Sequence, residues 1–519
     1  ILSILMTLLL CAMSARAEGN PPAIEDDGIL RVALTSLGDP QSLTLTFSGV
    51  YAVEGDAGFC FDRDASVTFF QRGGQVWMSA GGLKLDFGDS VTLTRHAAKQ
   101  GEENGIYIAE SEKHALYEGD LTLAVHGGGL RPILKIRIED YLKGVVAYEM
   151  SDSFPLEALK AQAVAARTYA MSRKFASGGR AYDLTDTASD QVFKGYDPKY
   201  ANVIAAVDAT NGVVGLDGDA FAECYYTASN GGQVARPRDV WGGGSEMIRL
   251  KDDPYDLENP RSLVNSISFQ ADLSDCAALK RMIEAKLGPS RTFQRILSIA
   301  PGDPDPADSR RYTTLSVRLE ALGSEAEEET VTLDVFDDVK DGLSLGLNGR
   351  DYELITVSRE GSAFTLQMRR FGHGAGMSQR GAQCMAGQHG MSWEEILAFY
   401  YPGMTLERIQ WSAPALSPLD GVTWGAARPA ATPQPACAPL PELEPGERYA
   451  KVTLAHGDSA LNLRQRPSTG ARVLAKLADG QRVILMGGDD AEGWARVRTA
   501  QAQGYVKAEF LTEEQRELE

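Results

Sequence analysis

The stretch GVVAYEMSDSFPLEALKAQAVAARTYA, residues 144–170, joins an apolar run to an alanine-rich segment through a proline. The apolar run ends in a single carboxylate, Glu149, and the proline is Pro155. Alanine-rich sequence after a proline is typical of a helix, so we expect one that has Pro155 at its first position and Asp152 or Ser153 as its cap. A lone acid therefore lies directly before a long helix.

Glu149 has two interpretations. As a surface acid or a partner of the helix N-terminus, it has a pKa that is lowered by the helix dipole. As a general acid that works at neutral pH, it needs the opposite, a pKa that is raised by apolar surroundings. The flanking valines and methionine supply such surroundings, and the residues alone leave both interpretations open.

The predicted helix runs to about Phe175, because Gly178 and Gly179 follow it. Lys160 and Arg167 lie seven residues apart and project from one face of this helix. They form either an ordinary solvated face or a basic ridge beside the acid that binds a carboxylate or sugar hydroxyls. The spacing does not decide between these alternatives.

Outward from this stretch, the pattern predicts an α+β fold. Residues 28–136 alternate apolar and polar positions in short runs, which indicates strands and turns. Helical patterns return at 137–411, which makes this a mixed section of helices and strands. Residues 412–447 are rich in proline and alanine and predict an extended linker. Residues 448–513 again alternate, as a small all-β barrel does.

Composition narrows the possible functions. The 519 residues predict two to four domains, and acidic residues outnumber basic ones, 71 to 51, for a net charge of −20. Such a chain has no basic field to displace counterions, which excludes a nucleic-acid surface. Residues 1–17 are typical of a secretory signal that is cleaved after Ala17, so we expect a protein outside the membrane. The remaining cysteines are scattered and odd in number, which indicates no disulfide framework.

Two glycine-rich stretches carry hydrogen-bonding side chains. FGHGAGMSQRGAQ, residues 371–383, surrounds His373 with glycines that permit positive φ. It suits the floor of a pocket, and it equally suits a tight turn into a helix. YYTASNGGQ, residues 225–233, has aromatic, hydroxyl and amide groups that suit either sugar recognition or a loop.

These stretches together resemble one protein family. RIEDYLKGVVAYEMSDSFPLEALKAQAVAARTYAMSRK, DTASDQVFKG, YYTASNGGQ and FGHGAGMSQRGAQ occur in the order and spacing of the sporulation stage II protein D family, which includes the amidase-enhancer proteins called LytB. The resemblance covers roughly residues 28–411. Residues 448–513, with ALNLRQRPSTGARVLAKL, resemble a bacterial SH3 domain of the kind found on cell-wall proteins.

The resemblance implies a function and a site. The family's best-known member is a lytic transglycosylase that cleaves peptide-free peptidoglycan strands and leaves 1,6-anhydromuramic ends. Its catalytic glutamate falls on Glu149, which would act as both acid and base without a cofactor. By the same analogy, further residues support or bind the substrate; they are Lys160, Gln162, Arg167, Gln191, Tyr226, Ser229, His373, Ser378 and Gln379.

The resemblance leaves a second function and a metal question. Amidase-enhancer members act on another wall hydrolase, so the chain is alternatively a non-catalytic enhancer whose partner is a cell-wall amidase or a sporulation wall-remodelling complex. Some family members hold zinc near the DTASDQVF motif through histidine and cysteine. This stretch has Thr185, Asp186 and Asp190 instead, and we expect no metal here. The expected location is extracytoplasmic, at the cell wall.

Overall fold

The computed structural model forms two compact units, Ile1–Gly421 and Val422–Glu519. It describes residues 26–305, 311–323, 328–419, 443, 447–454, 461–468, 471, 473–477, 481–486, 493–499 and 502–513. The predicted signal, 1–17, lies outside the described residues, as does most of the predicted linker. Helices and strands both contribute throughout, which confirms the α+β fold class.

The β-rich section folds into two sheets around one core. The strands alternate as the sequence predicts; in β2, every second side chain is buried. A seven-stranded sheet has the order β12 (Leu184–Thr185), β1 (Ile29–Ala33), β11 (Gly129–Arg137), β10 (Asp120–His126), β8 (Ser90–His96), β3 (Val50–Val53) and β4 (Asp56–Phe61). A five-stranded sheet has the order β7 (Leu83–Asp86), β6 (Gln75–Ala80), β5 (Ser66–Arg72), β2 (Ser42–Phe47) and β9 (Ile106–Ile108).

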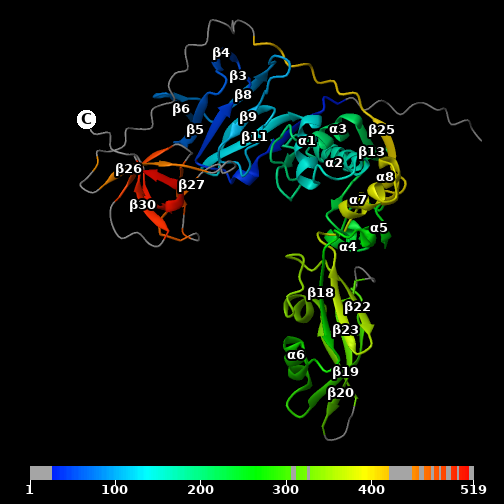
Figure 1. The fold of residues 1–519 in the computed structure, drawn as a ribbon. Coiled ribbons are helices and arrows are strands. Elements are labelled where there is room, and N and C mark those ends of the chain that lie inside the picture. Colours follow the sequence, from blue (N-terminus) through cyan, green and yellow to red (C-terminus); the bar gives the residue numbers. More distant parts are fainter. Residues whose placement is uncertain are drawn as a thin grey trace, which may run out of the picture. The chain divides into compact units, whose positions relative to one another are not determined.

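A group of helices continues directly from this section, because α1 begins where β11 ends. Helix α2 is nearly surrounded by protein, so its alanines allow close packing against α1, α3, α7 and α8. Figure 1 shows these helices together, although α7 and α8 come much later in the chain than α1. The bounds are α1 (Ile138–Glu149), α2 (Leu156–Ala176), α3 (Ala201–Ala209), α7 (Gln379–Gly387) and α8 (Trp393–Tyr400).

The long predicted helix is present, but its predicted start is wrong by one residue. Pro155 is the N-cap of α2 rather than its first residue, and no side chain caps this helix. The carboxylate of Asp152 instead accepts a hydrogen bond from the backbone N–H of Val203, in the first turn of α3. Asp152 is thus a helix-capping residue, as its type predicts, but for a different helix.

Short elements connect the helices around the site. They are α4 (Pro237–Trp241), α5 (Pro254–Glu258) and three small sheets: β14 (Ala220–Phe221) with β13 (Val213–Asp217) and β25 (Thr405–Arg408); β15 (Tyr226–Thr227) with β24 (Met377–Ser378); and β16 (Gln233–Val234) with β17 (Lys251–Asp252). The pairing of β15 with β24 joins the two glycine-rich stretches side by side.

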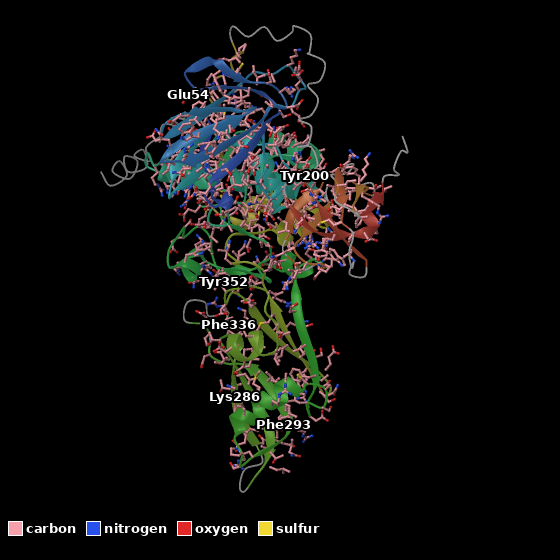
Figure 2. The ribbon with its side chains drawn as sticks, turned by 90° about the vertical axis from the view of Figure 1, so that its left-hand side faces the viewer. Glu54, Tyr200, Lys286, Phe293, Phe336 and Tyr352 are labelled. Carbon is pink, nitrogen blue, oxygen red and sulfur yellow. The ribbon has the colours of Figure 1, made fainter. Side chains whose placement is uncertain are left out.

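Between α5 and α7, the chain builds a second hydrophobic core. Phe293 and Phe336, labelled in Figure 2, contribute to it. Its elements are β18 (Val264–Gln270), β23 (Ala363–Arg369) and β22 (Leu354–Glu360) in one sheet, β19 (Thr292–Pro301), β20 (Thr314–Leu322) and β21 (Glu328–Asp334) in another, with α6 (Ala277–Leu287) and a π-helix, Val335–Asp341. The sequence did not distinguish this core from the rest of 137–411.

The C-terminal unit is built from strands and one short 3-10 helix, Ala508–Phe510, in its described residues. Its seven strands form an antiparallel sheet around a small separate core. In sheet order they are β28 (Val473–Leu477), β27 (Leu461–Arg464), β31 (Gln503–Lys507), β30 (Trp494–Arg498), β29 (Arg482–Leu485), β26 (Arg448–Val452) and β32 (Leu511–Glu513). Across both units, the described helices are too short or too polar to cross a lipid bilayer.

Candidate active site

Glu149 is the last residue of α1, and neutral hydrogen-bond donors contact its carboxylate. The side-chain amide of Gln379 donates to Glu149 Oε2 over 3.2 Å, and the backbone N–H of Val192 also donates to this carboxylate. Burial raises the pKa of Glu149, and the two donors only partly oppose this effect. The predicted apolar surroundings therefore favour the protonated form, as a general acid requires.

Gln379 lies at the first position of α7, and a buried hydroxyl fixes this helix start. Ser378 Oγ accepts the backbone N–H of Gly381, which caps α7. The same hydroxyl donates to Asp256 Oδ2 over 2.5 Å, and Ser229 Oγ donates to Asp256 Oδ1 over 2.9 Å. Ser229 and Ser378 thus fix the backbone that positions Gln379, and the structure gives them this supporting contact.

Asp256 is a site residue that the sequence did not indicate. It is fully buried and also accepts the backbone N–H of Asn230 over 3.0 Å. It comes from α5, in a segment with no distinctive motif, so only the folded chain brings it to the glycine-rich stretches. Its carboxylate joins YYTASNGGQ to FGHGAGMSQRGAQ by hydrogen bonds. The pairing of β15 with β24 also joins these two stretches.

Gln191 connects three elements near Glu149. Its amide nitrogen donates to the carbonyl of Ala166 in α2 and to the hydroxyl of Tyr226, over 3.2 and 3.0 Å. Its amide oxygen accepts the hydroxyl of Tyr141 in α1 over 3.3 Å. Burial and the nearby charge of Glu149 both raise the pKa of Tyr226, which keeps its phenol protonated. Because its oxygen accepts from Gln191, its hydrogen remains a donor for a ligand.

His373 is held neutral between two glycines. Its Nδ1 accepts the backbone N–H of Ala375 over 3.1 Å, and its ring also hydrogen-bonds the Tyr226 backbone. Burial lowers the pKa of His373 to about 4. The backbone has φ of +100° at Gly372 and +77° at Gly374, a conformation that glycine adopts without strain. Both predicted roles of this stretch are present, since it lines a cavity and then turns into α7.

A cavity of about 820 Å³ lies beside these residues. Aromatic rings dominate its wall, and the polar groups include the His373 ring, the Asp190 carboxylate and the Arg350 guanidinium. Its aromatic members are Tyr169, Tyr225, Tyr226, Trp241, Tyr352 and His373. Flat rings with a few polar groups suit a ligand that has both C–H faces and hydroxyls, as a sugar does.

Part of this wall was not predictable from local sequence. Arg350 and Tyr352, the latter labelled in Figure 2, come from the segment that carries the second core. Trp241 ends α4, and its ring centroid lies 4.8 Å from that of His373. Tyr225 is the exception, since it lies in a stretch whose composition indicated ligand recognition.

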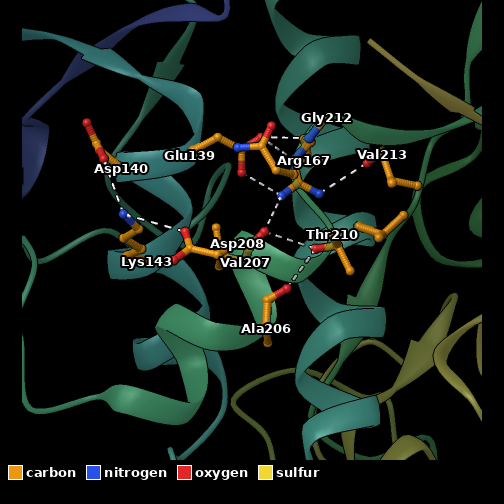
Figure 3. Close-up of polar contacts among 12 residues, drawn as sticks. Glu139, Asp140, Lys143, Arg167, Ala206, Val207, Asp208, Thr210, Gly212 and Val213 are labelled. Carbon is orange, nitrogen blue, oxygen red and sulfur yellow. Dashed lines mark hydrogen bonds and ion pairs between the residues drawn. The ribbon is translucent and has the colours of Figure 1, made fainter. Parts of the chain in front are cut away.

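One interpretation placed Arg167 on a solvated face of the helix, and this interpretation is wrong. Arg167 is completely buried and makes a bidentate ion pair with Glu139 of α1, over 2.9 and 2.6 Å (Figure 3). It also donates to the carbonyls of Val207 and Val213. A basic ridge open to a ligand is therefore absent at Arg167, and its contacts instead fix α1 against α2, α3 and β13.

The remaining predicted residues of α2 differ in their surroundings. Lys160 pairs with Glu157 over 2.6 Å, and the other oxygen of Glu157 accepts the backbone N–H of Trp393 in α8. Gln162 is fully buried, and neither atom of its amide has a hydrogen-bond partner in the part of the chain that the structure describes. Such a group is uncommon in a folded protein and often marks a functional position.

One group of side chains has the ligand types of a metal site. Glu258, Cys384 and His389 bring their ligand atoms within 4.8 Å of one another. His389 Nε2 already lies 2.7 Å from Glu258 Oε2, and the Cys384 thiol has a pKa that burial and nearby carboxylates raise. These contacts account for the group without an ion, and we assign it no metal.

Comparison with known proteins matches the chain to two families. The stage II sporulation protein family matches residues 126–215, and the bacterial SH3 domain family matches residues 459–512. The amidase enhancer of Bacillus subtilis (strain 168) is 30% identical over 292 residues, which are 51% of this chain and 40% of that protein. Stage II sporulation protein D of the same strain is 26% identical over 325 residues, 59% of this chain and 85% of that protein.

A third relative extends the match. An uncharacterized protein of Brachyspira hyodysenteriae (strain ATCC 49526 / WA1) is 30% identical over 297 residues, which are 56% of this chain and 72% of that protein. These matches give the chain a stage II sporulation protein domain followed by a bacterial SH3 domain. The chain belongs to the family of stage II sporulation protein D and the amidase enhancer.

Proposed function

We propose that the protein is a lytic transglycosylase that cleaves peptidoglycan glycan strands between N-acetylmuramic acid and N-acetylglucosamine. The observation that carries the proposal is the environment of Glu149: a carboxyl group whose burial raises its pKa, next to an aromatic-lined cavity. Tyr226 links the two, because it lines the cavity and interacts electrostatically with Glu149. A family relationship to sporulation and amidase-enhancer proteins is consistent with a wall substrate.

In the proposed reaction, protonated Glu149 donates its proton to the glycosidic oxygen as the bond from C1 to that oxygen breaks. The resulting carboxylate then takes the proton of the muramic 6-hydroxyl, whose oxygen forms a new bond to C1. The products are a 1,6-anhydromuramic end and a free 4-hydroxyl. One carboxyl group suffices, because the sugar's own hydroxyl replaces the water that a glycoside hydrolase activates with a second carboxylate.

Asp190 is the carboxylate among the residues that line the cavity, and its contacts argue against a role as that base. It pairs with Arg173 over 2.9 Å and accepts the backbone N–H and hydroxyl of Thr185. These contacts already occupy its carboxylate oxygens. Single-acid chemistry therefore fits the site better than two-acid hydrolysis.

The other predicted residues receive positioning roles in this proposal. Gln379 orients the carboxyl group of Glu149 directly. Gln191 and Tyr226 hold a phenol donor at the cavity, and Ser229 and Ser378 fix the start of α7. Arg167 acts at a distance, by fixing the helix that ends in Glu149. The C-terminal unit is assigned to binding of the cell wall, where a tether raises the local substrate concentration.

The alternative is a non-catalytic enhancer of a cell-wall amidase, which the printed name of one relative favours. Purified protein incubated alone with isolated peptide-free glycan strands separates the two. The proposal predicts progressive shortening of the strands, measured by chromatography, without any partner. Strands that keep their length alone, together with faster peptide release when an amidase is present, would support the enhancer instead.

A further inference from the structure

A second cavity, of about 300 Å³, lies against α1. Helix α1 contributes Gly144, Ala147 and Tyr148 to its wall. These residues follow helical spacing, so they form one face of α1, and Glu149 is the next residue along. The remaining wall comes from residues 113–115 and from residues 194–200, which include Tyr200, labelled in Figure 2.

This cavity is positively charged in a strongly acidic protein. Lys113, Lys194 and Lys199 line it, against one lining carboxylate, Asp197, in a chain of net charge −20. Asp197 is paired with Lys199 over 2.5 Å. Among the lining residues, the ammonium groups of Lys113 and Lys194 therefore give the cavity its excess positive charge. A concave surface of one sign concentrates ligands of the opposite sign.

Lys194 is the best-placed of these cations. Its side chain is only 13% exposed, and the carboxylate that pairs with it, Glu112, lies 4.0 Å away and is itself 72% exposed. Lys113 lies over the ring of Tyr148, 4.8 Å from its centroid. A mostly buried ammonium with a distant, solvated partner is poorly compensated, so it would gain from a closer anion.

One continuous segment joins this cavity to the proposed catalytic acid. Asp190 lines the first cavity, Val192 donates its N–H to the carboxylate of Glu149, and Lys194 lines the second cavity. Four residues of chain span no more than about 14 Å, even when fully extended. The parts of the two cavity walls that this segment supplies therefore lie close to each other and to the acid.

We propose that this second cavity is a subsite for a carboxylate on the substrate, bound by Lys194 and Lys113. The inference rests on the proposed function: in a glycan strand, the carboxylate is the lactyl group of a peptide-free muramic acid. An attached stem peptide converts that group to an uncharged amide and adds bulk, which the subsite disfavours. Lys194 and Lys113 would then favour the binding of peptide-free strands over strands that keep their stem peptides.

The test measures binding to the full chain carrying Glu149→Gln, which prevents turnover during the measurement. Three probes are compared: peptide-free strands, the same strands with lactyl carboxylates converted to methylamides, and strands that keep their stem peptides. Each is titrated against three proteins: the Glu149→Gln chain itself and this chain with Lys194→Gln or with Lys84→Gln. Lys84 is an exposed lysine of β7 and serves as the matched control.

We expect Lys194→Gln to raise the Kd for peptide-free strands about tenfold and to leave the already weak binding of the methylamide strands unchanged. Lys84→Gln should change neither value. A Lys194 effect confined to peptide-bearing strands would identify a stem-peptide carboxylate as the ligand, and this would overturn the lactyl assignment. Equal effects on charged and amidated strands, or none, would overturn the subsite altogether.

The outcome is separable from the proposed function. If Lys194→Gln has no effect on binding while wild-type protein still shortens glycan strands, the subsite is contradicted and the proposed enzyme activity stands. If Lys194→Gln weakens binding but the wild-type protein cleaves nothing, the subsite stands and the proposed enzyme activity is contradicted.

Discussion

Glu139 and Glu149 stand near the two ends of the same helix and have opposite environments. Glu139 faces the guanidinium of Arg167 and further donors from Gly212 and Trp411, so its charge is compensated. Glu149 faces an amide and a backbone N–H, which are neutral, and burial raises its pKa. The comparison teaches that the role of a carboxylate depends on the donors around it rather than on its residue type or its helix. Charged donors suit a structural ion pair, whereas neutral donors and burial suit a proton donor.

Removal of the cation at the Glu139 end gives the largest expected effect on stability. Arg167→Met leaves a mostly buried carboxylate without its counter-charge, and we expect the free energy of unfolding to fall by about 3–5 kcal/mol. Urea unfolding followed by circular dichroism measures this change. The matched control is Arg295→Met, whose pair with Glu320 is exposed, so that its loss should change the free energy of unfolding far less. A loss at Arg167 no larger than at Arg295 would contradict the structural role of this ion pair.

Removal of the amide at the Glu149 end should change activity and its pH dependence. Gln379→Leu deletes a donor that lowers the pKa of Glu149, so that pKa rises further and the alkaline limb of the kcat/KM profile moves to higher pH. The lost orientation should lower the maximal kcat/KM by about tenfold. Gln388→Leu, at an exposed glutamine after the same helix, is the control and should change neither. An alkaline limb that moves to lower pH would be inconsistent with the contact as described.

The comparison also predicts a stability gain from loss of the acid. Because the folded pKa of Glu149 is raised, folded protein keeps a proton that unfolded chain releases, and stability falls as pH rises from the ordinary glutamate pKa through the raised value. Glu149→Gln has no carboxyl group to titrate, so this pH-dependent fall in stability should be absent from the variant. At neutral pH its free energy of unfolding should exceed that of wild type by about 1 kcal/mol, and the difference should vanish in acid. Thermal unfolding at several pH values measures it, and destabilisation at neutral pH would argue against a desolvated carboxyl.

The smallest expected effect concerns Gln162. Its buried amide makes no described hydrogen bond, so Gln162→Met should leave the free energy of unfolding unchanged or raise it by up to about 1 kcal/mol. Gln191→Met is the contrast, since that amide bonds three partners and its loss should destabilise the fold. If Gln162 supports the substrate, kcat/KM should fall although stability does not. A marked loss of stability would mean that this amide is satisfied in the folded protein.

Local sequence predicted those features that depend on near neighbours. The apolar run before Glu149, the helix after Pro155 and the positive φ of Gly372 and Gly374 follow from spacing and residue type, and the structure contains all of them. The predicted cap failed because the nearest N–H for Asp152 belongs to α3 rather than α2.

The features that were missed depend on distant contacts. The sequence did not show that Arg167 is buried, because its partner Glu139 lies 28 residues earlier, on a different helix. Asp256, Arg350 and Tyr352 lie far along the chain from most of the residues that they meet at the site, and no local pattern marks them. Their positions follow from tertiary packing, which spacing along the sequence does not encode.

Mass spectrometry of glycan products tests the central claim most directly. Purified peptide-free strands are incubated with wild-type protein and with Glu149→Gln, and the ends of the fragments are identified by mass. The account predicts 1,6-anhydromuramic ends from wild type and a loss of at least about 100-fold in Glu149→Gln. Reducing ends from wild type, or equal anhydro products from both proteins, would contradict the assignment of Glu149 as the single acid and base.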